Sequence, residues 1–109
     1  MRRILLTTLA HSILLIPHQA ATAADEATEK GRAMAERLCA VCHMNPGQGE
    51  KAAASGVPSF IAVANRPAQT FEGVQAWLQS VPPMMPNHNL TRDEIHNLAA
   101  FIMSLRRKP

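Results

Sequence analysis

Two cysteines and a histidine lie together in the run Cys39-Ala40-Val41-Cys42-His43. This C-x-x-C-H spacing is the attachment sequence for c-type haem. Two thiols so close in the chain can add to the two vinyl groups on one edge of a porphyrin, and the imidazole that follows can coordinate the iron. The run therefore predicts one haem c, covalently bound through Cys39 and Cys42, with His43 as an iron ligand.

Other uses of a C-x-x-C pair fit this chain less well. A thioredoxin-like pair needs a preceding strand and a βαβ unit, and the sequence predicts neither. A structural zinc site would need His43 and a fourth ligand such as His88 or His96, yet adjacent cysteine and histidine residues are poorly placed around one tetrahedral ion. A disulfide that closes so short a loop would contribute little stability. Haem attachment is the hypothesis that remains.

A methionine could supply the second axial ligand, because a thioether raises the reduction potential and closes the iron to outside ligands. Met84 and Met85 lie between prolines in the run VPPMMPN, residues 81–87. A stiff loop without regular backbone pairing suits a thioether that must stay at a fixed distance from iron. The residues alone leave the choice between the two methionines open, and both could instead be gap-filling core side chains.

The beginning of the chain has the features of an export signal. Two arginines open it, an apolar run follows over residues 4–16, and the small residues Ala21-Thr22-Ala23 provide a cleavage site. We expect residues 1–23 to be a cleaved signal peptide and residues 24–109 to form one domain. The apolar run falls short of the roughly 20 residues that span a bilayer, so no stable membrane anchor is expected. Haem attachment after export indicates the bacterial periplasm.

Composition favours a small domain that depends on a cofactor. The chain has 109 residues with two Cys, three Phe, one Trp and no Tyr, so its core is modest and a disulfide-rich scaffold is excluded. The formal net charge of +3 includes two arginines of the expected leader. No basic stripe interleaved with aromatic residues remains, and nucleic-acid binding is therefore not expected.

Helices are predicted along the rest of the chain, and no segment alternates as a strand would. A loop rich in Pro and Gly is predicted over residues 45–56. The first predicted helix covers residues 27–41, and a short second one covers residues 58–64. A third begins after Thr70 and stops before Pro82. The last begins at a capping box formed by Thr91 and Glu94.

The order of these features resembles that of the class I c-type cytochromes, and the resemblance covers residues 31–105. It is carried by Gly31 on the first helix, the haem motif, Pro58, the Met-Pro loop and Phe101 on the last helix. It implies an all-α fold: a single cytochrome c-like domain of about four helices around one covalently bound haem.

The resemblance also implies roles for single residues. The axial thioether falls on Met85, directly before the loop proline, and the carbonyl of Pro58 accepts a hydrogen bond from the proximal imidazole. Gly31 and Phe101 become the crossing point of the first and last helices. Trp77 becomes a donor toward the haem or its axial sulfur, although its helical spacing is equally explained by a core anchor.

The resemblance further implies a periplasmic, monomeric electron carrier that passes single electrons between redox partner proteins, membrane-bound or soluble, and is not an enzyme. Two alternatives remain open from the sequence. One is a dedicated haem subunit of a larger periplasmic dehydrogenase. The other is a ligand-binding or peroxidase haem protein with an open iron site.

Overall fold

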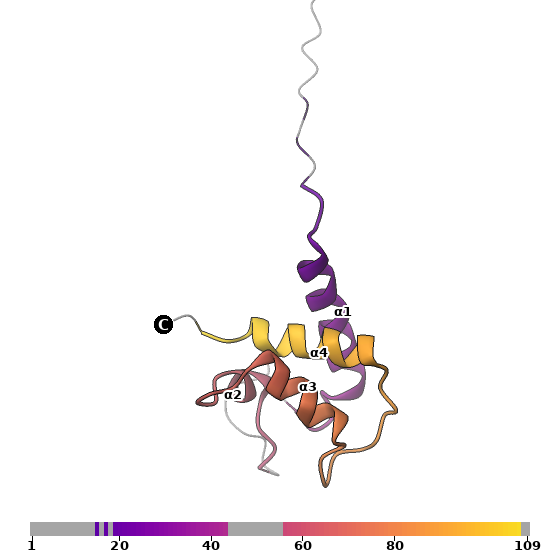
Figure 1. The fold of residues 1–109 in the computed structure, drawn as a ribbon, viewed down its shortest axis with the longest axis vertical. Coiled ribbons are helices and arrows are strands. Elements are labelled where there is room, and N and C mark those ends of the chain that lie inside the picture. The colour runs from indigo at the N-terminus through magenta and orange to yellow at the C-terminus, as the bar shows by residue number, and fades with distance from the viewer. Residues whose placement is uncertain (1–14, 16, 18, 44–55, 108–109) are drawn as a thin grey trace, which may run out of the picture.

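The computed structural model describes residues 15, 17, 19–43 and 56–107. Within these ranges the chain is helical and contains no strand (Figure 1), which confirms the all-α prediction. Most of the predicted leader, and all of the predicted loop over residues 45–56 except Gly56, lie outside the described residues. The helices are α1 (Ala23–Leu38), α2 (Phe60–Ala64), α3 (Phe71–Gln79) and α4 (Arg92–Ser104).

A hydroxyl side chain begins every one of these helices by accepting a hydrogen bond from a backbone N–H of the first turn. The four N-caps are Thr22, Ser59, Thr70 and Thr91. At α4 the Glu94 carboxylate accepts in return from the backbone N–H of Thr91, so the predicted capping box is present. These caps satisfy N–H groups that have no partner inside the helix.

Helix α1 begins four residues earlier than predicted and ends three residues earlier. Its start is displaced because Thr22 and Asp25 form a second capping box, within the stretch assigned to the leader and its cleavage site. The hydrogen bonds from Thr22 lower the pKa of the Asp25 carboxyl. The end is displaced because the residues after Leu38 form a separate turn.

Helices α1 and α4 cross at a steep angle and share the most extensive contact between helices in the described structure (Figure 1). Gly31 lies at the crossing. A Cβ atom added there would stand 1.9 Å from the carbonyl oxygen of Asn97 and 2.8 Å from the Cβ of Phe101. Only a residue without a side chain permits this approach. The crossing of Gly31 and Phe101 is therefore confirmed.

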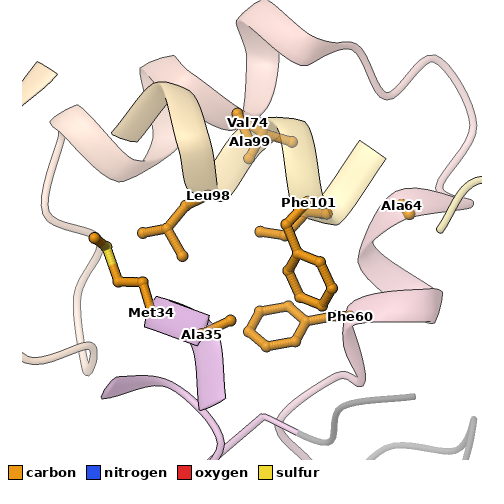
Figure 2. Close-up of a cluster of buried hydrophobic side chains, with 9 residues drawn as sticks. Met34, Ala35, Phe60, Ala64, Val74, Leu98, Ala99 and Phe101 are labelled. Carbon is orange, nitrogen blue, oxygen red and sulfur yellow. The ribbon is translucent and has the colours of Figure 1, made fainter. Parts of the chain in front are cut away.

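The hydrophobic core lies between α4 and the other helices (Figure 2). Helix α4 supplies the largest share, and each of the other three helices adds one or two side chains. Burial of each larger side chain stabilises the fold by roughly 1.5–3 kcal/mol. The buried core residues are Met34, Ala35, Phe60, Ala64, Val74, Leu98, Ala99, Phe101 and Ile102.

Asn65 joins the end of α2 to the end of α4. Its side-chain amide donates to the carbonyl of Ile61 at 2.8 Å and to that of Leu105 at 3.4 Å. Its side-chain oxygen accepts from the backbone N–H of Arg107 at 2.9 Å. One amide thus satisfies two carbonyls at helix ends and fixes α2 relative to the terminal helix.

The segment between α3 and α4 has an unusual backbone. Val81, Met84 and Asn89 adopt φ values of 47°, 70° and 52°, in the left-handed region. Asn tolerates this region, but a β-branched residue such as valine does so only at a cost in free energy. The loop that carries the two candidate methionines therefore holds a strained residue just before its first proline.

Gly31→Ala is expected to lower the free energy of unfolding by about 3 kcal/mol, because the new methyl group forces the two helices apart. Urea unfolding of the haem-loaded protein measures this change. Gly73→Ala is the matched control on α3: its Cβ would meet a side-chain oxygen at 3.1 Å, and the helix preference for alanine offsets the crowding. Equal losses in both variants would contradict the crossing argument.

Val81→Asn is expected to raise the free energy of unfolding by about 1 kcal/mol, because asparagine adopts the left-handed conformation at a lower cost than valine. Thermal unfolding monitored by circular dichroism measures the effect. A lower melting temperature in the variant would mean that contacts of the valine side chain outweigh its backbone strain.

Candidate functional site

The C-x-x-C-H residues form a turn directly after α1. Cys39 is the C-cap of the helix, and its carbonyl accepts from the backbone N–H groups of Cys42 at 3.1 Å and of His43 at 2.9 Å. This spacing places the two cysteines about one helical turn apart. Both cysteines are free thiols, so the disulfide alternative does not describe this structure.

The two thiols differ in environment. Cys39 is half-buried and lines a cavity beside Leu38, and its burial raises the pKa of the thiol, which favours the neutral form. Cys42 is exposed. Of the two thiols, Cys39 therefore lies beside a cavity, and Cys42 lies at the surface, where it lines neither cavity.

The imidazole of His43 lies against the loop that precedes α2. Its Nδ1 atom is 2.8 Å from the carbonyl oxygen of Pro58. Because a carbonyl can only accept, Nδ1 carries the proton and donates. In the neutral ring this leaves the lone pair on Nε2 available to a metal ion. The hydrogen bond implied by the resemblance is thus present, and it fixes the tautomer that iron ligation requires.

Two cavities of about 330 Å³ each adjoin these residues. Cys39 lines one of them and His43 lines the other, and both walls are predominantly apolar. Leu78, Pro82 and Met85 line both cavities, so the two spaces meet along these three residues. A large, flat, mostly apolar group attached at the cysteines fits this space, and the residues present fit a haem.

The two methionines of the loop differ in placement. Met85 is half-buried and lines both cavities, whereas Met84 lines only the cavity of His43. The side chain of Met84 is fully exposed and its backbone is left-handed. His43 and Met85 thus approach one cavity from separate segments, which is the arrangement that two axial ligands need.

Trp77 lines the His43 cavity but is 56% exposed. The interpretation of Trp77 as the core anchor of α3 is therefore wrong. The residue of α3 that reaches the core is Val74, one turn earlier. Because only one face of this short helix packs against the core, Trp77 stays outside it. Trp77 is on the cavity wall, where an indole N–H could reach a bound group.

Two contributors to the site were not predicted. Leu78 lines both cavities, and Phe60 stacks against the ring of His43. Phe60 follows Pro58 by two residues, and this closeness to the expected partner of His43 was the only available signal for the contact. Helical periodicity does not indicate that Phe60 contacts His43, which is 17 positions away.

The zinc alternative lacks support in the described ranges, where no three His, Cys, Asp or Glu side chains gather closely enough to hold a metal ion. His96 packs edge-on against Phe71, with ring centroids 5.1 Å apart, and His88 lies exposed on the loop. The described helices also include none that is both long and apolar enough to cross a membrane.

Comparison with known proteins adds sequence similarity to this geometry. Residues 26–102 match a protein family described as cytochrome c oxidase, cbb3-type, subunit III. The chain is 41% identical over 76 residues to a cytochrome c-552 of Bradyrhizobium diazoefficiens, an alignment that covers 70% of this chain and 72% of that protein. No solved structure is significantly similar to it.

Proposed function

This chain belongs to the c-type cytochromes and is a monohaem electron carrier, and on that premise we propose that His43 and Met85 are the axial ligands of a haem c bound through Cys39 and Cys42. The observation that carries this assignment is the hydrogen bond from His43 Nδ1 to Pro58, which leaves Nε2 as the ligating atom beside a cavity that Met85 also lines. We include Pro58 and Trp77 in the haem-binding set.

The haem, when bound, supplies an iron that gains and loses one electron. The protein determines how readily this happens. A carbonyl acceptor at Nδ1 makes the imidazole a better electron-pair donor and fixes its tautomer. A thioether ligand from Met85 would favour the reduced state of the bound iron. No bond needs to form or break in the protein.

The cavity walls supply the second contribution. Apolar side chains such as Leu78 and Leu98 keep water away from the bound group, which also favours the less charged, reduced iron. Trp77, exposed at the cavity wall, could donate its N–H to a propionate. We propose that the carrier passes electrons between redox partner proteins and transforms no substrate.

We propose that residues 1–23 are an export signal and that residues 24–109 are the mature domain of a monomeric periplasmic protein. The basic start, the apolar run and the small residues before the cut support this.

A second candidate function has one specific observation in its favour. The matching family is described as a subunit of an oxidase, and a dedicated haem subunit of a larger oxidoreductase would use the same ligands. Such a subunit would copurify with a larger protein in stoichiometric amount, whereas a free carrier elutes alone. An open-site haem protein is the third candidate, and it requires that Met85 does not bind the iron.

Met85→Ala is expected to abolish the weak far-red absorption band of the ferric protein that reports sulfur on iron, to lower the reduction potential and to allow carbon monoxide to bind the reduced form. The absorption spectrum of the ferric protein measures the band, and the spectrum of the reduced protein with carbon monoxide measures binding. Redox titration measures the reduction potential. Met84→Ala is the matched control and is expected to keep the band. Loss of the band in Met84→Ala alone would reassign the ligand, and absence of the band from the unmodified protein would favour the open-site protein.

The protein purified from the periplasmic fraction is expected to have the mass of residues 24–109 plus one haem, and to elute as a monomer. Cleavage at the small-residue site and addition of two thiols across two vinyl groups account for that mass. Intact mass spectrometry and size-exclusion chromatography measure the two properties. A mass that retains the leader would contradict the export proposal, and constant association with a larger protein would favour the subunit.

A further inference from the structure

We propose that Phe60 is a positioning residue for the iron ligand: its ring sets the plane of the His43 imidazole. The inference rests on the proposed function, in which His43 ligates the haem iron. The two rings are stacked, with centroids 5.0 Å apart and planes inclined by only 16°. Offset stacking at this distance is a favoured geometry for flat rings.

The hydrogen bond to Pro58 does not by itself fix the imidazole plane. It holds one atom, Nδ1, against one acceptor. A ring held at Nδ1 and at a ligating Nε2 can still twist about the line that joins these two atoms, as far as the torsions of its own side chain allow. A flat surface against the ring face opposes this twist, and Phe60 provides that surface. The hydrogen bond therefore sets the tautomer, and the stacked ring sets the orientation.

Phe60 is itself held firmly in place. Its side chain is only 4% exposed, and the ring of Phe101 meets its ring edge-on, with centroids 6.0 Å apart and planes inclined by 76° (Figure 2). Its backbone opens α2, where the buried Ser59 hydroxyl accepts from the backbone N–H of Ala62 at 3.1 Å. A ring fixed by the core and by a helix cap can orient a neighbour.

The contact of Phe71 with His96 shows what an aromatic–histidine pair looks like elsewhere in this chain. Those rings meet edge-on, with planes inclined by 76°, and His96 is exposed. At His43, by contrast, the rings are close to parallel and Phe60 is joined through Phe101 to the crossing at Gly31. A phenylalanine needed only for its volume could be replaced by leucine without consequence for the imidazole.

The test replaces Phe60 by leucine in the haem-loaded protein and records the haem-methyl proton resonances of the ferric form. The spread of these resonances depends on the angle of the ligating imidazole plane. We expect one set of resonances for the unmodified protein, and a changed spread or a second set for Phe60→Leu. Phe60→Tyr retains the ring and is expected to restore the original pattern.

Phe71→Leu is the matched control, because the ring of Phe71, although only half-buried, likewise contacts a histidine and packs on the core. It is expected to lower the melting temperature without moving the haem-methyl resonances. An unmoved pattern in Phe60→Leu, with a melting temperature lowered as in Phe71→Leu, would overturn the proposal and leave Phe60 a core residue. If the unmodified protein lacked the signature of His/Met ligation, the proposed ligands would fail instead.

Discussion

The close approach of α1 and α4 at Gly31 is the constraint on which the rest of the structure depends. Because no side chain separates the helices there, the buried face of α1 lies directly against Leu98 and Phe101 of α4. The end of α1 then delivers the two cysteines and His43 beside the core. A small domain with few aromatic residues thus obtains both its packing and the direction of its binding motif from one helix crossing.

The two sides of the site are built by different means. On the His43 side, a carbonyl of the loop before α2 and a ring of the core hold the imidazole, and Asn65 ties that short helix to the end of α4. On the Met85 side, the support is a loop with prolines and residues of positive φ. The first side is fixed by packing and the second by restricted backbone conformation.

Much of the fold could be predicted from the sequence, because its helices carry local signals. Thr70 and Thr91 mark their starts, and apolar spacing gives the buried face of α4. What could not be predicted depends on contacts between distant segments or on competing local signals. The Thr22–Asp25 box was hidden in a stretch that also reads as a cleavage site, and the exposure of Trp77 follows from how α3 sits on α4.

The cap at Thr22 has a consequence for the order of events in maturation. If the leader is removed after Ala23, the bond to be cut lies in the first turn of α1, and a protease that binds an extended substrate cannot reach it there. Cleavage must then precede the winding of this turn. It also leaves a new ammonium group at the positive end of the helix dipole, where the carboxylates of Asp25 and Glu26 offset its charge.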